Sequence, residues 1–193
     1  MLVATDELLR DLEAMHRSPT QLQIELEQRA SRDGVPVISH ATGRFLATIV
    51  VAMQANRILE IGTAYGDATL WMALAQPSVG KIWTIDDRAD RTDVARSYFR
   101  RAGVNESIEV FNTSPLRMLE NFSHRNVDIA FVAAGEDDCM RYLELLVPML
   151  KLSGLAVFND ALTMHGFAQR FLAHPELQAT ILPFGIGLGA RRQ

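Results

Sequence analysis

One short stretch of the chain constrains the fold most, because an apolar run, two glycines and a helix-forming segment follow one another in it. The stretch extends from Arg57 to Ala75 and reads RILEIGTAYGDATLWMALA. Its apolar run ends at Ile61, and Gly62 and Gly66 then interrupt the pattern, which predicts a strand, a tight turn and a helix. Glycines let a backbone approach a ligand closely, and the start of a helix offers N–H groups without intrahelical partners. The sequence therefore predicts a ligand-binding turn in an α/β protein.

Two acidic residues narrow the class of ligand. Glu60 lies at the end of the first strand, where a carboxylate repels phosphate and attracts a cation. Asp86 ends the next strand-like run, Lys81–Asp86, twenty residues after Gly66. In doubly wound folds an acidic side chain at the end of the second strand commonly accepts hydrogen bonds from ribose hydroxyls. We therefore expect a ligand that contains a nucleoside and a positive charge.

The glycine spacing separates this turn from the common nucleotide-binding loops. It is Gly-x-x-x-Gly, whereas pyrophosphate sites use Gly-x-Gly-x-x-Gly and phosphate-cradling loops end in Lys followed by Ser or Thr. S-adenosylmethionine, a sulfonium nucleoside, fits this pattern better than NAD or ATP. A simpler interpretation treats the glycines as ordinary turn residues, and it loses weight because Glu60 and Asp86 accompany them in this order.

Several motifs resemble one family of enzymes. From about Val35 to the C-terminus the chain is similar to the catechol O-methyltransferase and caffeoyl-CoA O-methyltransferase family, whose members use S-adenosylmethionine. The resemblance implies a Rossmann-like methyltransferase fold and methyl transfer to an oxygen. The motifs that carry it are Leu59–Thr63 with Gly66, Thr84–Asp86, Arg101–Val104, Val127–Phe131, Gly154–Leu155 and Gly187–Arg191.

The resemblance also implies which residues contact the cofactor. The backbone of one residue before the third helix and the glycine turn would meet its methionine moiety, with one carboxylate near the ammonium and another on the ribose. Residues after the third strand would meet the adenine, although the Gly-Asp-Ala usual there is missing. The implied cofactor residues are Ile38, Glu60, Gly62, Thr63, Gly66, Asp86, Ser114 and Pro115.

One departure lies inside the cofactor motif. Asp67 and Ala68 replace the Tyr-Ser that is common in the family after this glycine. The change removes a hydroxyl that helps to hold the cofactor carboxylate, so we expect reduced affinity.

A second departure concerns the metal. The resemblance implies an Asp after the fourth strand, a lysine three residues later and an Asp-Asn pair after the fifth strand, but these positions hold Ala133, Glu136 and the reversed pair Asn159-Asp160. Ala133 cannot bind a metal, and a shift of one residue points a strand-end side chain in a different direction. Carboxylates at 136–138 could build another oxygen-rich site, although the dipole of a following helix explains them more simply. We expect no bound divalent metal.

The loop after the fifth strand holds the candidate catalytic residues Asp160 and His165. His165 could take a proton from a hydroxyl group, and Asp160 could orient it. In the alternative interpretation Asp160 caps the next helix and His165 is a loop residue. His40 also falls near the site, where a role at the start of a helix is the simpler explanation.

Composition places the chain among ordinary globular proteins. Its 193 residues, 48% hydrophobic and 22% charged, suit a single domain, with N-terminal helices in 1–34 and the core in 35–193. The net charge of −4 gives no support for nucleic-acid binding. A single cysteine, Cys139, the lack of a signal sequence and the lack of an apolar run that could span a bilayer predict a cytoplasmic protein. The N-terminal helices either cover the domain or contribute to a homodimer.

The pattern of strands alternating with helices predicts an α/β fold with a doubly wound, mostly parallel sheet of seven strands and extra N-terminal helices. Five to six helices surround the sheet, and the last two strands form an antiparallel pair. The expected strands are 58–61, 81–86, 108–111, 127–132, 154–158, 179–183 and 186–190. The expected helices include 6–16, a helix that Thr20 caps and that ends near Asp33-Gly34, 40–55, one ending at Gly103, and 140–150.

Two classes of function fit these observations. The first is a methyltransferase that acts on an oxygen of a small molecule without a divalent metal, and the intact cofactor motif favours it. The second is a relative that binds the cofactor or a partner without turnover, and Ala133 and Glu136 favour it. A dinucleotide-dependent oxidoreductase is disfavoured by the glycine spacing.

Overall fold

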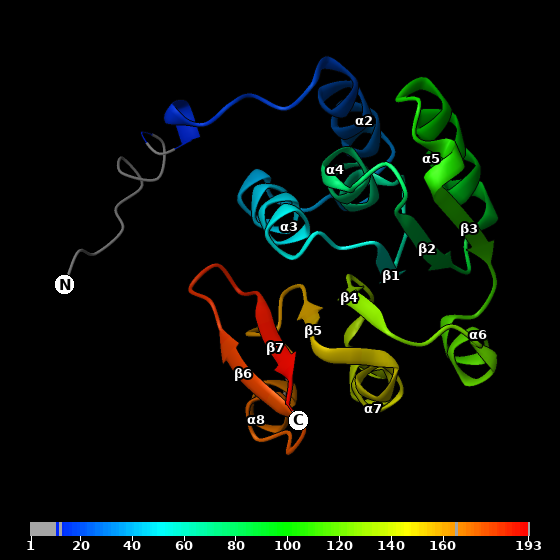
Figure 1. The fold of residues 1–193 in the computed structure, drawn as a ribbon. Coiled ribbons are helices and arrows are strands. Elements are labelled where there is room, and N and C mark those ends of the chain that lie inside the picture. The colour runs from blue at the N-terminus through cyan, green and yellow to red at the C-terminus, as the bar shows by residue number, and fades with distance from the viewer. Residues whose placement is uncertain (1–10, 12, 165, 193) are drawn as a thin grey trace.

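The computed structural model describes residues 11, 13–164 and 166–192, which are organised around a seven-stranded sheet (Figure 1). The strand order is β3-β2-β1-β4-β5-β7-β6, with parallel pairs from β3 to β5. β7 runs antiparallel to both β5 and β6, so the predicted sheet and its closing pair are confirmed. The strands are β1 Arg57–Ile61, β2 Lys81–Asp86, β3 Ile108–Asn112, β4 Val127–Val132, β5 Leu150–Phe158, β6 Leu177–Ile181 and β7 Gly187–Arg191.

Helices cover both faces of the sheet. α2 to α5 share one buried cluster with the sheet, and α6 to α8 share the other. In Figure 1 the helices α3, α4 and α5 accordingly lie apart from α6, α7 and α8. The helices are α2 Gln21–Arg32, α3 His40–Met53, α4 Asp67–Ala75, α5 Ala89–Arg101, α6 Pro115–Asn121, α7 Cys139–Leu146 and α8 Phe167–Leu172, with short 3₁₀ turns η1 Asn105–Ser107, η2 Glu136–Asp138 and η3 Val147–Met149.

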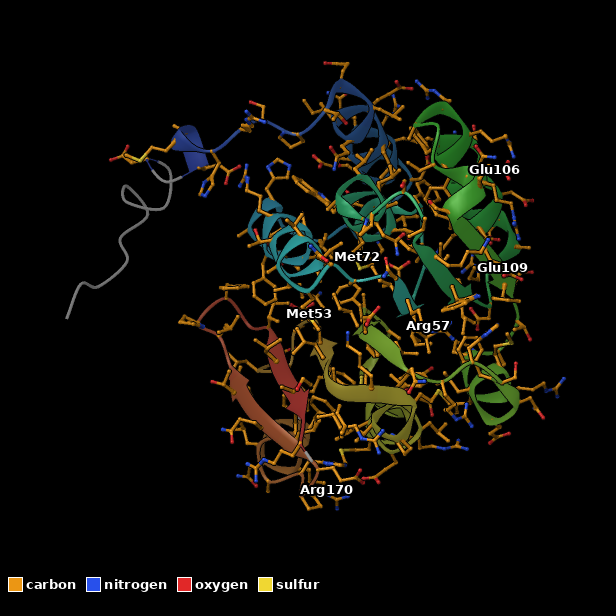
Figure 2. The ribbon with its side chains drawn as sticks, viewed as in Figure 1. Met53, Arg57, Met72, Glu106, Glu109 and Arg170 are labelled. Carbon is orange, nitrogen blue, oxygen red and sulfur yellow. The ribbon has the colours of Figure 1, made fainter. Side chains whose placement is uncertain are left out.

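Alternation along the central strand decides which side chains face which layer. In β1, Ile58 belongs to the cluster under α2 to α5, whereas Leu59 and Ile61 belong to the cluster under α6 to α8. Because successive side chains of a strand point to opposite faces, Glu60 faces the same layer as Ile58. Met72 of α4 is completely buried in that layer (Figure 2). The strand thus directs a carboxylate into an apolar layer.

Local chemistry explains where several helices begin. Thr20 caps α2 as predicted, and its capping box pairs the Thr20 hydroxyl with the backbone N–H of Gln23 and the Gln23 side chain with the backbone N–H of Thr20. Ser39 caps α3, and its side chain accepts a hydrogen bond from the N–H of Thr42. Pro115 is suited to the first turn of α6, where its missing N–H needs no partner.

The predicted boundary between the helix 140–150 and the strand 154–158 is wrong. α7 ends at Leu146, η3 follows, and β5 begins at Leu150, which pairs with Val127 of β4. The start of β5 is therefore determined by its pairing with β4, which the local sequence pattern does not indicate. Most of the predicted helix 6–16 lies outside the described residues. Within the described part of the chain, no helix has the length and apolar character needed to cross a membrane.

Candidate functional site

A pocket of about 280 Å³ opens at the carboxyl ends of β1, β4 and β5. The segments 36–38, 62–64, 67–68, 133–135 and 159–160 line it, together with Met164. It lies where the chain order of the sheet reverses between β1 and β4. Open α/β sheets bind ligands in the crevice outside the strand ends at this reversal. The predicted turn and the candidate catalytic loop therefore meet at one pocket.

The turn after β1 has a shape that only glycine allows at two positions. Gly62 has φ of 97°, and a Cβ there would lie 2.5 Å from the carbonyl oxygen of Ala133. Gly66 has φ of 88°, and its Cβ would lie 2.5 Å from the ring of Phe99. Both positions thus combine a left-handed backbone with a close approach. The turn backbone is pressed against the end of β4, and α4 begins directly after it.

Asp86 is held firmly at the end of β2. Its carboxylate accepts hydrogen bonds from the backbone N–H of Ala64, at 2.8 Å, and of Arg88, at 2.9 Å. The residue is 7% exposed and is not part of the pocket lining. One bond comes from the glycine turn, so the ends of β1 and β2 are fixed relative to each other. Ser114 and Pro115 also lie outside this lining, at the start of α6.

Glu60 is completely buried beneath the pocket. One carboxylate oxygen accepts hydrogen bonds from the hydroxyls of Thr69 and Thr84, whereas the other has no hydrogen-bond partner among the described residues. Burial raises the pKa of Glu60 to about 7. The Thr84 hydroxyl lies 2.6 Å from that of Thr63, which lines the pocket. Glu60 thus reaches the pocket through two hydroxyl groups and does not line it.

Asp67 is a pocket residue to which the sequence alone assigned no binding or catalytic role. It is the first residue of α4 and is 5% exposed, and one of its oxygens accepts a hydrogen bond from the backbone N–H of Ile38 at 3.2 Å. Burial first and the charge of Glu27 second raise the pKa of Asp67 to about 7. The sequence signal that could have drawn attention to Asp67 was that it replaces the tyrosine common in the resembled family. The contact with Ile38 had no sequence signal, because 29 residues separate the two.

The other rim of the pocket carries Asn159 and Asp160. The Asn159 amide donates a hydrogen bond to Asp160 at 2.7 Å, and Asp160 has a left-handed backbone with φ of 55°. The alternative role of Asp160 as a helix cap is wrong, because Gly166 caps α8. The Asp160 carbonyl instead accepts hydrogen bonds from the backbone and hydroxyl of Thr163. The second candidate, His165, lies outside the described residues.

The residues of this rim do not fit the metal site that the resemblance implies. Ala133 lies at the expected first ligand position and offers no side-chain donor. Among residues 11, 13–164 and 166–192, no three His, Cys, Asp or Glu side chains are grouped to hold a metal ion. Asp138 lies 3.9 Å from Arg141 one turn along α7, which agrees with a role at the helix start. The expected lack of a divalent metal stays a prediction.

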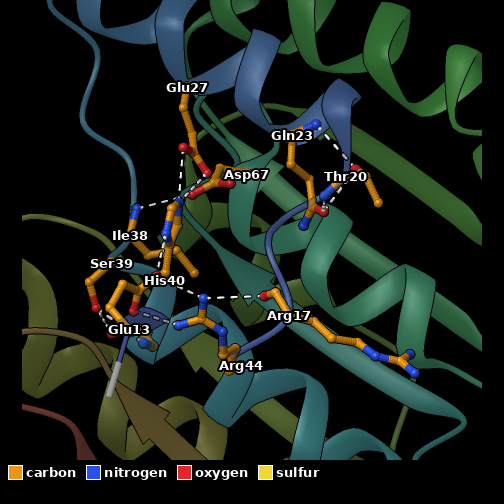
Figure 3. A network of polar contacts seen from close by, with 11 residues as sticks. Glu13, Arg17, Thr20, Gln23, Glu27, Ile38, Ser39, His40, Arg44 and Asp67 are labelled. Carbon is orange, nitrogen blue, oxygen red and sulfur yellow. Dashed lines mark hydrogen bonds and ion pairs between the residues drawn. The ribbon is translucent and has the colours of Figure 1, made fainter. Parts of the chain in front are cut away.

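His40 belongs to a polar network beside the pocket (Figure 3). One ring nitrogen lies 3.0 Å from Glu13, and the other lies 3.0 Å from Glu27 of α2. Arg44 also pairs with Glu13, at 2.7 Å. Although burial lowers the pKa of His40, the bonds to Glu27 and Glu13 outweigh it and raise the pKa. His40 is the first residue of α3, as the simpler interpretation has it, and its contacts with Glu13 and Glu27, which the sequence did not indicate, join the N-terminal segment to α2 and α3.

Comparison with known proteins identifies the family. A sequence model of the O-methyltransferase family matches residues 18–179. The chain belongs to this family. It is 27% identical over 160 residues to a catechol O-methyltransferase of Mycobacterium tuberculosis, covering 75% of this chain and 73% of the relative. It is 31% identical over 124 residues to a caffeoyl-CoA O-methyltransferase of Populus kitakamiensis, covering 62% of this chain and 53% of the relative. The chain thus spans about half the length of that plant relative.

Solved structures of methyltransferases show the same fold. A methyltransferase from Geobacter sulfurreducens superimposes with a TM-score of 0.89 at 21% identity, covering 100% of this chain and 99% of that one. An O-methyltransferase of tomaymycin synthesis from Streptomyces achromogenes, solved with S-adenosylmethionine, has a TM-score of 0.84 at 19% identity and covers 95% of each chain. The predicted fold and the predicted O-methyltransferase family are confirmed. The alternative without turnover is not favoured.

Proposed function

We propose that this protein transfers a methyl group from S-adenosylmethionine to an oxygen of a small molecule, without a bound divalent metal. One observation supports this most: Asp86 is fixed beside a turn that only glycine allows, in a chain of the O-methyltransferase family. Each carboxylate oxygen of Asp86 accepts one backbone N–H, and each retains a lone pair that can accept a ribose hydroxyl. The rigid position makes Asp86 a suitable ribose acceptor.

The other predicted cofactor residues are assigned to the two ends of the cofactor, on either side of the ribose that Asp86 would bind. We assign Ile38, Gly62 and Thr63 to the methionine end, because all three line the pocket. Glu60 acts on the ammonium through Thr84 and Thr63, since its own carboxylate is buried under the turn. Gly66 sets the start of α4, and Ser114 and Pro115 are assigned to the adenine end.

When bound, S-adenosylmethionine supplies an electrophilic methyl group on a sulfonium centre. The chain contributes position first, because an oxygen held in line and close to the reacting carbon gains most of the advantage of an intramolecular reaction. Asp160 is the proposed proton acceptor for the substrate hydroxyl, and Asn159 orients it through the bond to its carboxylate. On methylation the carbon–sulfur bonding pair would return to the sulfur of the bound cofactor, and the proton of the substrate hydroxyl would pass to Asp160. His165 stays a second candidate for the same step.

The proposed independence from metal rests on the chemistry of the donors. Calcium and magnesium in proteins take six or more oxygen ligands, and magnesium usually combines one or two carboxylates with water. On this rim Ala133 contributes none, and Asp160 is already hydrogen-bonded by Asn159. The acceptor is therefore positioned by the walls of the pocket, in which Ala134, Gly135 and Met164 take part.

Calorimetry tests the cofactor assignment. Wild-type protein should bind S-adenosylmethionine and S-adenosylhomocysteine, and Asp86→Ala should weaken both by about 10-fold to 100-fold, because a charge-assisted pair of ribose bonds is lost. Asp87→Ala is the matched control, since it removes an adjacent, exposed carboxylate and should leave affinity unchanged. Wild-type protein that binds neither nucleoside would refute the proposal.

Three further predictions accompany this function: a single domain over residues 1–193, a cytoplasmic location and a homodimer. Exposed apolar side chains such as Phe184, whose ring contacts Phe45, are available for a subunit contact. Light scattering during size-exclusion chromatography distinguishes a monomer of 21.5 kDa from a dimer.

A further inference from the structure

Asp67 projects into the cofactor pocket from the first turn of α4. It lines the same pocket as Thr63 and Ile38, yet only 5% of its surface is exposed. Figure 3 shows its carboxylate turned toward the backbone of Ile38, with Glu27 and His40 close by. The position is therefore deep in the wall of the pocket and not on its outer rim.

The hydrogen bonding of Asp67 is incomplete. One oxygen accepts the N–H of Ile38 at 3.2 Å, but the other, which is also buried, has no partner in the described part of the chain. A buried polar atom without a partner costs free energy, more so when it belongs to a charged group. Such an atom in the wall of a pocket is available to a ligand.

The carboxylate takes the place that a ligand carboxylate would use. Backbone N–H groups at the start of a helix and at Ile38 are the donors of this wall, and Asp67 already uses the one at Ile38. Ala68 offers no hydroxyl, and no Lys or Arg lies among the described residues that line the pocket. An amino-acid end brings an ammonium, which ionised Asp67 attracts, and a carboxylate, which it repels.

We infer that Asp67 is a specificity-determining residue: the pocket accepts the amino-acid carboxylate of the cofactor when Asp67 is protonated, and resists it when Asp67 is ionised. The inference rests on the proposed use of S-adenosylmethionine. Protonated Asp67 donates its O–H to the ligand carboxylate and releases the N–H of Ile38 as a second donor. A sulfonium nucleoside with the amine but without the carboxylate binds ionised Asp67 as a cation beside an anion.

Groups on every neighbouring element bear on this protonation. Glu27 on α2 and, where it is ionised, Glu60 on β1 favour the protonated form of Asp67, whereas protonated His40 on α3 opposes it. Burial is the largest cause that raises the pKa of Asp67, to about 7. The charge of Glu27 affects the pKa of Asp67 more than the charge of His40 does, although the two side chains lie 3.0 Å apart.

The inference is tested by titrating the full chain with S-adenosylmethionine at about pH 6 and at about pH 8.5. These values lie on either side of the pKa of Asp67. The wild-type protein should bind at least about tenfold more tightly at the lower pH, because one proton must be taken up for each ligand bound at the higher pH. Buffers with different ionisation enthalpies should report that uptake. Asp67→Asn, which imitates the protonated residue, should bind with the low-pH affinity at both values and without proton uptake.

Controls separate Asp67 from other titrating groups. Asp87→Asn, which removes an exposed carboxylate outside the pocket lining, should keep the pH dependence of the wild type. The decarboxylated analogue of S-adenosylmethionine lacks the carboxylate that ionised Asp67 repels. At about pH 8.5 it should therefore bind the wild-type protein more tightly than it binds Asp67→Asn.

The outcomes are distinguishable. Equal affinity of the wild-type protein for S-adenosylmethionine at both pH values would overturn the role of Asp67 and leave the proposed function intact. Persistent proton uptake in Asp67→Asn would do the same. Absence of binding by every nucleoside to every form of the protein would overturn the proposed function itself. Because the wild-type titrations need no substitution, the test does not depend on the folding of the variant.

Discussion

The two rims of the pocket have different relations to the family pattern. The cofactor rim lies at the ends of β1 and β2, where the glycine turn is fixed by Gly62 and by the hydrogen bonds of Asp86, as the family motif predicts. The acceptor rim lies at the ends of β4 and β5, where Ala133, Glu136 and a reversed Asn159-Asp160 pair stand at the positions of the metal ligands and the lysine. The glycine turn and Asp86 thus keep the family pattern, whereas the departures lie at Asp67 and Ala68 and on the opposite rim. The predictions below test this contrast, beginning with the largest effect.

Gly62→Ala should break the cofactor rim most severely. A Cβ at this position meets the Ala133 carbonyl at 2.5 Å and requires a left-handed backbone, so we expect nucleoside binding to be lost and unfolding free energy to fall by about 2–4 kcal/mol. Chemical denaturation and calorimetry measure the two effects. Gly103→Ala is the matched control, because φ there is 71° but nothing lies within 4 Å of the added Cβ. It should cost about 1 kcal/mol and leave binding intact. Equal losses in both variants would contradict the importance of the contact.

Asp160→Asn should separate binding from chemistry on the acceptor rim. Loss of a proton acceptor typically reduces kcat by about 10²-fold to 10⁴-fold, while the affinity for S-adenosylhomocysteine should change little. Methyl transfer to a panel of phenols, together with calorimetry, measures both quantities. Asp137→Asn removes an exposed carboxylate nearby and should leave kcat unchanged. Unchanged turnover in Asp160→Asn would move the role to His165.

Glu60 should make the folded protein less stable as pH rises. Its folded pKa of about 7 is above its ordinary value, so the folded state holds the proton more tightly than the unfolded chain. The free energy of unfolding should therefore fall between about pH 4.5 and pH 7, by at most about 3 kcal/mol for this residue. Glu60→Gln should flatten that slope in thermal melts, whereas Glu109→Gln, at the exposed rim in Figure 2, should not. An unchanged slope in Glu60→Gln would show that Glu60 stays ionised.

Divalent metal should have the smallest effect of all. A ligand stabilises a protein only through its binding to the folded state, so magnesium or manganese should leave Tm unchanged. A chelator should likewise leave methyl transfer unchanged. Activity that a chelator abolishes and magnesium restores would show that the carboxylates of 136–138 or Asp160 have rebuilt a site.

Local patterns predicted most of the fold. The strands 81–86 and 127–132 agree residue by residue, because each is a continuous buried run, and Thr20 was identified as a cap by its side chain alone. The start of β5 at Leu150 was missed, since a strand on another part of the chain determines it. The position of the site was predictable because strand ends converge in a doubly wound sheet. The partners of Glu60 and Asp67 were not, because each lies on a different element and only the fold brings them together.

The close contact between Gly62 and Ala133 limits where this pocket can evolve. A larger residue at Gly62 would press on the backbone of Ala133 and push the cofactor turn and the acceptor rim apart together, so new acceptor preferences cannot arise at Gly62 without harming cofactor binding. Two positions along, Gly135 lines the same pocket, and an added Cβ would meet nothing within 4 Å. A side chain can therefore be introduced at Gly135 while the cofactor turn stays undisturbed. Libraries that seek methylation of new substrates should begin at that glycine.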